Sequence, residues 1–405
     1  MILAGQIVRH STPGSVRLEY GWLRLKDHLI AESGAGKCPH RVDLGDENTL
    51  ITPGFVDAHV HLPQFDLIGA HGLTLMDWLA QVVYPAEARW EDPAFATNMI
   101  ERVYRQFLAV GTTSFAAFAT VHHKPALAAL DIAEKFGFRC AIGQVLMDRQ
   151  APDDLIRPAA QLARETAQLL RRKAGKPGSR VSGAIAPRFA VSCSSELLAE
   201  AGRLAAQFDV VVETHLSETQ DDCAMVRKLF PEDKNYTSVY EQFGILTNRT
   251  VFGHGIWLSD QERERLAAAG SVVAHCPVAN TFLRAGTFDL KAAKHHGLRM
   301  AIGSDIGAGY ERSMIHVAKA AIETANFRGG HFPTPQEMWW QITSGNAAAL
   351  GWGKSIGTLD AGFEADLCLI RPDIAWREAK DPLGMVLYAW DDRWLDKVIV
   401  GGRVT

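Results

Sequence analysis

The sequence has few cysteines and no apolar run long enough to cross a membrane. Its six cysteines are scattered along the chain without a Cys-x-x-Cys pair: Cys38, Cys140, Cys193, Cys223, Cys276 and Cys368. This spacing argues against a disulfide framework or a thiolate metal site, and it predicts a reducing, cytoplasmic location. Polar residues interrupt the apolar start of the chain at once, so we expect neither a signal peptide nor a membrane segment.

The sequence also lacks an excess of basic charge. It has 42 Lys and Arg against 46 Asp and Glu, and no block of basic residues. A nucleic-acid surface is therefore not expected. Hydrophobic residues make up 47% and charged residues 22% of the chain, which are ordinary proportions for a globular protein. We expect neither a nucleic-acid nor a membrane partner.

Short apolar runs alternate with longer amphipathic segments over most of the chain. Eight runs have the composition of buried strands: 55–61, 113–119, 138–146, 181–188, 210–215, 250–254, 271–275 and 298–304. Successive β/α units of this kind predict an α/β fold, a (β/α)₈ TIM-type barrel. An open, doubly wound sheet is the competing fold, but no glycine-rich turn of the dinucleotide-binding type follows the first predicted strand.

Strand-like sequence also occurs at both ends of the chain, before the first barrel strand and after residue 357. We expect the two ends to pair into one small β-sandwich beside the barrel. The predicted domains are therefore residues 1–52 (first part of the sandwich), 53–356 (catalytic barrel) and 357–405 (second part of the sandwich).

The strongest signal for chemistry is a pair of histidines at the end of the first predicted barrel strand. His59 and His61 are two residues apart, so on an extended strand they point to the same face. Catalytic groups of such barrels come from the carboxyl ends of the strands. The ends of later predicted strands carry further polar residues: Arg188, His215, His254, His275 and Asp305. Three imidazoles and a carboxylate suit zinc, iron or another divalent ion, which would activate a water molecule.

Several of these residues have alternative interpretations. Glu218 could be a solvated carboxylate at a helix N-terminus, or a general acid and base beside a metal-activated water. Asp305 could cap a helix, although we favour a ligand. His254 could be a further ligand or could hold the water. For His275, a structural role is as well supported as a substrate contact.

Taken together, these motifs resemble the amidohydrolase superfamily and, within it, the guanine deaminases. The resemblance extends over nearly the whole chain. Its motifs are His-Val-His-Leu-Pro-Gln-Phe at 59–65, Pro-Arg-Phe at 187–189, His-Leu-Ser-Glu at 215–218, Lys-Asn-Tyr-Thr-Ser-Val-Tyr at 234–240, His-Cys-Pro at 275–277 and Ser-Asp-Ile-Gly-Ala-Gly-Tyr at 304–310.

The resemblance implies a role for each motif residue. Four would hold one zinc ion per chain, with iron as the alternative metal: His59, His61, His215 and Asp305. Three would act in catalysis: Glu218, His254 and Asp305. Five would bind a purine: Gln64, Phe65, Arg188, Phe189 and His215.

The implied activity is hydrolytic deamination of guanine to xanthine and ammonia, in purine catabolism, by a cytoplasmic homodimer. One alternative is the same chemistry on 8-oxoguanine, a pterin or an aminotriazine. Others are a hydrolase that removes chloride or another leaving group, and a metal-binding scaffold without catalysis. A deaminase of the cytidine type is excluded, because its Pro-Cys-x-x-Cys motif is absent from the sequence.

Overall fold

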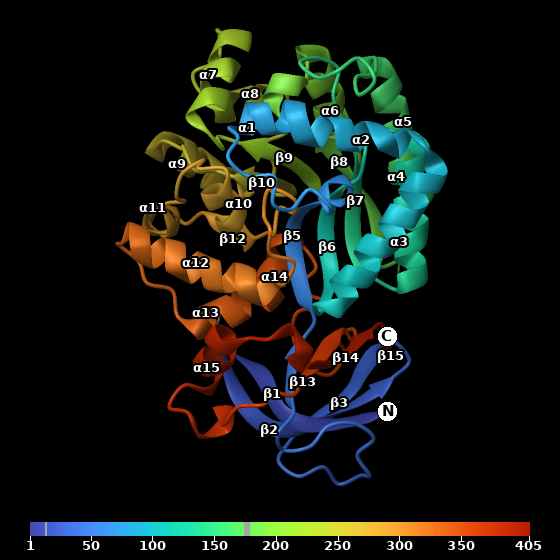
Figure 1. The fold of residues 1–405 in the computed structure, drawn as a ribbon, viewed down its shortest axis with the longest axis vertical. Coiled ribbons are helices and arrows are strands. Elements are labelled where there is room, and N and C mark those ends of the chain that lie inside the picture. The colour runs from blue at the N-terminus through green and yellow to red at the C-terminus, as the bar shows by residue number, and fades with distance from the viewer. Residues whose placement is uncertain (13, 174–178) are drawn as a thin grey trace.

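The chain forms two sheets, one curved into a barrel and one built from the two chain ends (Figure 1). The computed structural model describes residues 1–12, 14–173 and 179–405. The barrel strands follow one another in chain order and are parallel: β5 (Phe55–His61), β6 (Thr112–Phe118), β7 (Arg139–Leu146), β8 (Val181–Pro187), β9 (Val212–Leu216), β10 (Thr250–His254), β11 (Val272–His275) and β12 (Arg299–Ile302). Each overlaps its predicted strand, so the predicted (β/α)₈ barrel is confirmed.

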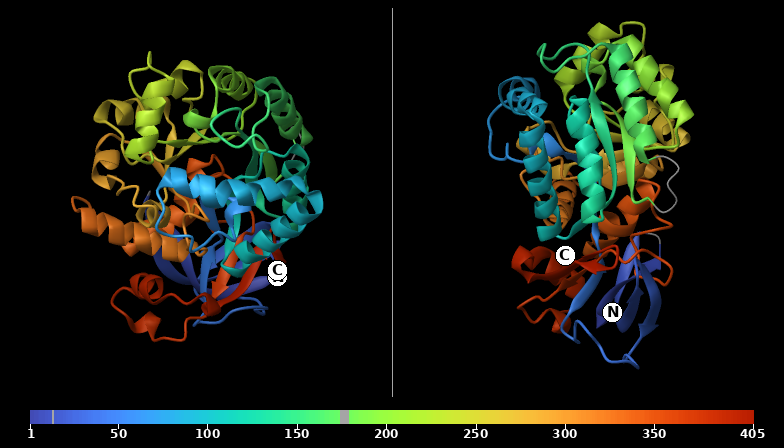
Figure 2. Two further views of the ribbon diagram at one scale, coloured as in Figure 1. Left: turned by 45° about the horizontal axis from the view of Figure 1, so that its top comes forward. Right: turned by 90° about the vertical axis from the view of Figure 1, so that its right-hand side faces the viewer.

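Helices surround the barrel on its outer side (Figure 2). Those between the strands are α1 (Leu75–Trp78), α2 (Tyr84–Ala88), α3 (Pro93–Ala109), α4 (His123–Phe136), α5 (Ala159–Lys173), α6 (Ser195–Gln207), α7 (Gln220–Leu229), α8 (Tyr236–Gln242), α9 (Asp260–Ala269), α10 (Pro277–Phe282) and α11 (Leu290–His295). Four more follow the last barrel strand: α12 (Met314–Arg328), α13 (Pro335–Trp340), α14 (Asn346–Ala349) and α15 (Pro382–Ala389).

Local sequence explains where many of these helices begin and end. Ser194 caps α6 by accepting a hydrogen bond from the backbone of Leu197, and Ser259 and Glu262 form a reciprocal capping box on α9. α4 ends at Gly137, whose φ of 82° lies in the left-handed region that favours glycine. No helix in the described ranges is long and apolar enough to span a membrane.

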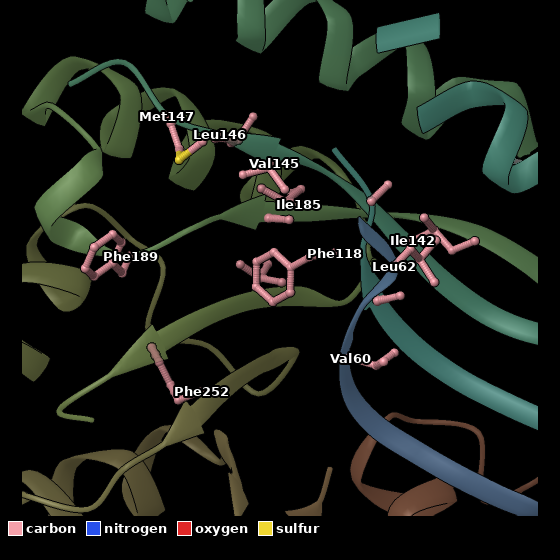
Figure 3. Packing of buried hydrophobic residues seen from close by; sticks show 14 of the residues in the cluster. Val60, Leu62, Phe118, Ile142, Val145, Leu146, Met147, Ile185, Phe189 and Phe252 are labelled. Atoms are coloured by element: carbon pink, nitrogen blue, oxygen red, sulfur yellow. The ribbon is translucent and has the colours of Figure 1, made fainter. Parts of the chain in front are cut away.

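Small side chains fill the lower interior of the barrel, whereas large ones pack between the strands and the helices. The interior layer consists mainly of alanine and valine: Val56, Ala58, Ala116, Ala141, Ala184, Val211, Val251, Val272, Ala274 and Ala301. Side chains of β5, β7 and β8, including Val60, Ile142 and Ile185, belong to the larger core cluster (Figure 3). Because helices cover a parallel sheet from outside, its strands are buried along nearly their whole length.

Side chains join the first and last barrel strands. The hydrogen-bonded order of the strands starts at β5 and ends at β12. Between them, Asn346 Nδ2 donates to the carbonyls of Val56 and Ile302, both at 2.7 Å, and its Oδ1 accepts from the Ile302 amide at 2.9 Å. Higher in the same seam, Asp57 Oδ1 accepts from the backbone amide of Ser304 at 3.0 Å. Asn346 and Asp57 therefore close the barrel where the strand ladder stops.

Strands from both chain ends form the second sheet, in the order β15-β14-β13-β4-β1-β2-β3. They are β1 (Ile2–Thr12), β2 (Ser15–Lys26), β3 (Leu29–Ala35), β4 (Leu50–Pro53), β13 (Leu367–Ile370), β14 (Leu395–Val400) and β15 (Arg403–Val404). β4 runs parallel to β1, and the other neighbours are antiparallel.

This end sheet folds over a core of its own. The amide of Ile30, near the β3 edge, donates to the carbonyl of Phe363 at 2.8 Å, and Ile30 shares one buried cluster with Leu23 and Ile399. The predicted β structure from both chain ends beside the barrel is therefore confirmed, as one mixed sheet (Figure 2). The domain boundaries predicted near residues 52 and 356 stay a proposal.

Candidate metal centre and pocket

Three histidines and one aspartate meet at the carboxyl ends of the barrel strands. His59 and His61 lie on β5, His215 lies on β9, and Asp305 follows β12. One ligand atom from each of the four lies within 4.8 Å of the others, and all four residues are buried. These are the four residues predicted as metal ligands, and the fold brings them together.

His59 is at the centre of the cluster and has very little room around it. A side chain at Gly253 would place its Cβ 2.8 Å from the His59 ring, and one at Gly303 would lie 2.6 Å from the His59 Cβ. His59 Nδ1 lies 2.9 Å from Oε1 of Glu213, and both side chains are fully buried. His59 Nε2 has no hydrogen bond within the described residues. The ring therefore directs one unpaired nitrogen toward the other ligands.

His61 and His215 face each other across the cluster. Their Nε2 atoms are 3.1 Å apart, and His215 Nδ1 lies 2.6 Å from the carbonyl oxygen of Arg188. Because that carbonyl is only an acceptor, Nδ1 of His215 carries the proton and Nε2 presents its lone pair. Burial lowers the pKa of both histidines, which favours neutral, ligating imidazoles.

Asp305 adds a negative charge to these nitrogens. Its Oδ1 is 3.5 Å from His59 Nε2 and 3.4 Å from His61 Nε2, while its backbone amide donates to the His59 carbonyl at 2.9 Å. Burial alone would lower the pKa of His59, but the nearby carboxylates of Asp305 and Glu213 raise it to about 10. The carboxylates of Asp305 and Glu213 thus stabilise positive charge within the cluster.

The four side chains fit a divalent metal ion. Tetrahedral zinc, with bonds of about 2.0–2.1 Å to nitrogen, spaces neighbouring ligands by about 3.3 Å. The distances of 3.1–3.5 Å between the ligand atoms quoted above agree with that spacing. An unpaired nitrogen, neutral imidazoles and a carboxylate together form a donor set for a divalent metal.

Glu218 and His254 lie beside this cluster. His254 Nε2 is 3.5 Å from Glu218 Oε2 and 3.7 Å from Asp305 Oδ2, and its Nδ1 lies 2.8 Å from Oδ1 of Asn280. Asn280 Oδ1 is an acceptor, so the proton of neutral His254 sits on Nδ1 and Nε2 is free to accept one. Burial, followed by the charges of Asp305 and Asp222, raises the pKa of Glu218 well above its ordinary value.

Three residues of the site have unusual backbone conformations. Ser217, His254 and Asp305 have φ values of 48°, 71° and 48°, in the left-handed region that residues other than glycine seldom adopt. Such conformations cluster at functional sites, where the surrounding structure holds them. They turn the chain sharply at the ends of β9, β10 and β12.

A pocket opens next to the cluster. Its walls are formed by His61, Gln64, Leu75, Trp78, Leu79, Arg188, Phe189, His215, Glu218, His254, Leu283, Asp305 and Ala308. Gln64, Arg188 and Phe189, which we predicted as substrate contacts, are thus in the wall. Phe65 is not among the lining residues; it is buried and packs against Phe107, with ring centroids 5.9 Å apart. Its predicted substrate contact stays a prediction.

The structure also places residues for which the sequence left the role open. His275 is at the end of β11, stacked on Phe288 with ring centroids 5.0 Å apart, and its Nδ1 is 3.5 Å from Nδ2 of Asn280. The stretch after His-Cys-Pro forms α10, and Leu283 at its end reaches the pocket wall. His275 is therefore linked to His254 through Asn280.

The side chains at the site that sequence reasoning missed include Glu87, Trp78, Glu213 and Asn280. Glu213 had a detectable signal, because it is a lone acid two residues before His215 in an apolar strand and shares its face. Glu87 and Trp78 had none, because they come from helices that reach the pocket only in the folded chain.

A family model, related sequences and a solved structure agree on the proteins that this chain resembles. Residues 50–405 match the model of the amidohydrolase family. The chain is 34% identical to guanine deaminase of Escherichia coli K12, over 96% of this chain and 91% of that protein. It is 31% identical to human guanine deaminase, over 94% and 92% of the two chains. A crystal structure of guanine deaminase from C. acetobutylicum with bound guanine superposes with a TM-score of 0.94, at 26% identity, covering 100% of this chain and 99% of the other.

Proposed function

Since the chain belongs to the amidohydrolase family, we propose that it is a guanine deaminase, which hydrolyses guanine to xanthine and ammonia. The observation that carries the proposal is one buried pocket that holds a metal-type ligand cluster, an acid with a raised pKa and a polar wall suited to a purine. The relatives named guanine deaminase cover nearly the whole chain and favour guanine over the other amino-heterocycles.

We assign one zinc ion per chain to His59, His61, His215 and Asp305, with iron as the alternative metal. A divalent ion bound there supplies a Lewis acid that lowers the pKa of a water molecule toward neutrality. The donor set of imidazoles and a carboxylate, without a thiolate, supports this assignment.

The pocket wall suits the shape and polarity of guanine. Phe189 offers an aromatic face to the flat ring, and Arg188 offers N–H donors to the keto oxygen at C6. Gln64 offers a side-chain amide to the ring edge. His215 contacts both the metal site and the pocket, so the ring lies directly beside the cluster.

Glu218 and His254 carry out the proton transfers of the reaction. His254 Nε2 and the Asp305 carboxylate accept a proton from the attacking water as its oxygen bonds to C2 of guanine. Glu218, protonated because of its raised pKa, donates to the ring nitrogen N3 beside C2, which relieves the developing negative charge. The proton taken from the water is then delivered to the amino group at C2, so that the C–N bond breaks and ammonia leaves. The C2 hydroxyl returns its proton to Glu218 as the C2 carbonyl of xanthine forms.

The proposal is tested by measuring ammonia release from a panel of rings with the zinc-loaded protein. The panel includes guanine, 8-oxoguanine, a pterin, an aminotriazine and a chlorotriazine, with chloride release measured for the last. We expect the highest kcat/KM for guanine. A protein that turns over another ring but not guanine would refute the assignment, and no turnover of any ring would favour the scaffold interpretation.

The remaining assignments rest on the family resemblance. We propose a cytoplasmic homodimer that acts in purine catabolism, with barrel boundaries near residues 53 and 356. Light scattering coupled to size exclusion tests the dimer, and limited proteolysis tests the boundaries, because cleavage at exposed domain junctions precedes cleavage within a packed barrel.

A further inference from the structure

Glu87 is a buried carboxylate that contacts two polar groups of the pocket wall at once. It lies on α2 and is 3% exposed. Its Oε1 accepts from Nε2 of Gln64 at 3.0 Å and from Nη1 of Arg188 at 2.9 Å, and its Oε2 accepts from the same Nη1 at 2.7 Å. Glu87 is not among the residues that line the pocket. It therefore acts on a bound ring only through Gln64 and Arg188.

The contacts with Glu87 determine which side-chain atoms Gln64 and Arg188 present to the pocket. An ionised carboxylate only accepts hydrogen bonds, so Gln64 must turn its NH₂ group toward Glu87 and leave Oε1 free. Within the described residues, Gln64 Oε1 accepts no hydrogen bond, and the side-chain hydrogen bonds of Arg188 all leave from Nη1. The wall thus offers one acceptor, Gln64 Oε1, beside the remaining N–H donors of Arg188.

We propose that Glu87 is a positioning residue that makes the pocket select rings with a lactam edge, an N–H group next to a C=O group. The inference rests on the proposed function and deepens it. Guanine has such an edge at N1 and C6, where N1–H donates to Gln64 and the C6 oxygen accepts from Arg188. A ring with an amino group at C6 presents the opposite pattern, so its acceptor N1 meets Gln64 Oε1 and its donor meets Arg188.

The wild-type enzyme provides the first test. We compare kcat/KM for guanine, 1-methylguanine, which lacks the N1–H, and 2,6-diaminopurine, in which an amino group replaces the C6 oxygen. We expect guanine to be preferred by about a thousandfold over either, because buried polar groups left without partners reject an analogue strongly. Turnover of 2,6-diaminopurine within about tenfold of guanine would overturn the proposal.

The Glu87→Gln variant provides the second test. The new amide donates to Gln64 Oε1, so the Gln64 amide reverses and presents its NH₂ group to the pocket. We expect the kcat/KM ratio of guanine to 2,6-diaminopurine to fall by about tenfold or more, since one mismatched hydrogen bond is relieved. A role confined to folding would lower both rates alike, so an unchanged ratio would overturn the proposal.

Two controls make the outcome clear. Glu101→Gln, at a partly exposed residue of α3 that pairs with Arg105, should leave the ratio unchanged. Metal content and thermal unfolding show whether Glu87→Gln is folded, and if it is not, the wild-type panel alone decides. If another ring is turned over but guanine is not, the proposed function is wrong. Lactam selection is then tested separately, by comparing kcat/KM for that ring with kcat/KM for its analogues that lack the N–H or the C=O group.

Discussion

Oε1 of Glu213 lies 2.9 Å from Nδ1 of His59, and both side chains are inaccessible to solvent. Neither of these two atoms has a hydrogen bond elsewhere in the described part of the chain. The carboxylate fixes the ring orientation of His59 and keeps the proton on Nδ1, so that Nε2 faces His61 and His215. A carboxylate in this position also makes the imidazole a more basic metal ligand.

The first prediction concerns this pair. Glu213→Gln should weaken metal binding by about 10–100-fold, because the amide still accepts from Nδ1 but the negative charge is lost. Competition against a chromophoric chelator measures the affinity. Glu213→Leu, which leaves Nδ1 without a partner, should weaken it further. An affinity equal to that of the wild type in both variants would show that the pair has no influence on the metal.

The second prediction concerns the proton donor. Glu218→Gln should lower kcat by about a thousandfold, because the amide cannot deliver a proton to the ring nitrogen. Metal content should stay at the wild-type level, since Glu218 is outside the ligand cluster. Steady-state kinetics with metal analysis measures both. Glu241→Gln on α8, at a partly exposed position, serves as the control. Full activity in Glu218→Gln would remove Glu218 from the mechanism.

The third prediction concerns pH and Asp222, which caps α7. Burial raises the pKa of this carboxyl from 3.8 to about 6. Its protonated form is thus favoured in the folded state, so the contribution is fully present below about pH 4 and is lost as the pH rises through about 6. We expect the free energy of unfolding of the wild type to fall by about 3 kcal/mol at most, relative to Asp222→Asn, between these limits.

Denaturant unfolding of both proteins at several pH values measures this difference, and effects shared by the two proteins cancel. The asparagine keeps the side-chain oxygen that accepts from the Thr219 amide, at 2.7 Å in the wild type. A difference between the two proteins that does not change with pH would contradict a raised pKa.

The fourth prediction concerns the seam of the barrel. Asn346→Leu has a similar volume but leaves the carbonyls of Val56 and Ile302 without their partner. Each buried group left unpaired costs about 1–3 kcal/mol, so we expect a loss of about 3–5 kcal/mol in the free energy of unfolding. Thermal unfolding measures the loss. Asn248→Leu, in the loop before β10, is the control. Equal destabilisation by both substitutions would show that the hydrogen bonds of Asn346 contribute no more to stability than a loop position does.

The barrel and most of the ligand cluster could be predicted because they depend on local pattern. A strand buried on both faces needs an apolar run, and the residue after it lies at the barrel mouth whatever the details of packing. His59 and His61 share a face because they are two residues apart on β5. These relations hold within a single strand, so the sequence shows them directly.

The rest of the site depends on contacts between distant segments. Glu87 meets Arg188 across 101 positions of the chain, and no periodicity reports such a contact. Phe65 shows the opposite case, a predicted substrate contact whose side chain is not among the residues that line the pocket. It follows Gln64 directly, but the chain has left β5 for a 3₁₀ turn at Leu62–Gln64, so neighbours no longer alternate as they do on a strand. Its ring consequently packs into the core against Phe107.

The seam between β5 and β12 has a consequence for synthesis of the protein on the ribosome. His59 and His61 belong to the first barrel strand, whereas Asp305 follows the last, so the ligands come from opposite ends of the barrel sequence. A nascent chain that has not yet reached Asp305 cannot assemble the full ligand set, and neither can a prematurely terminated one. Metal binding by the proposed four-residue set therefore requires synthesis past Asp305, and it distinguishes chains that contain all eight barrel strands from chains truncated before that residue.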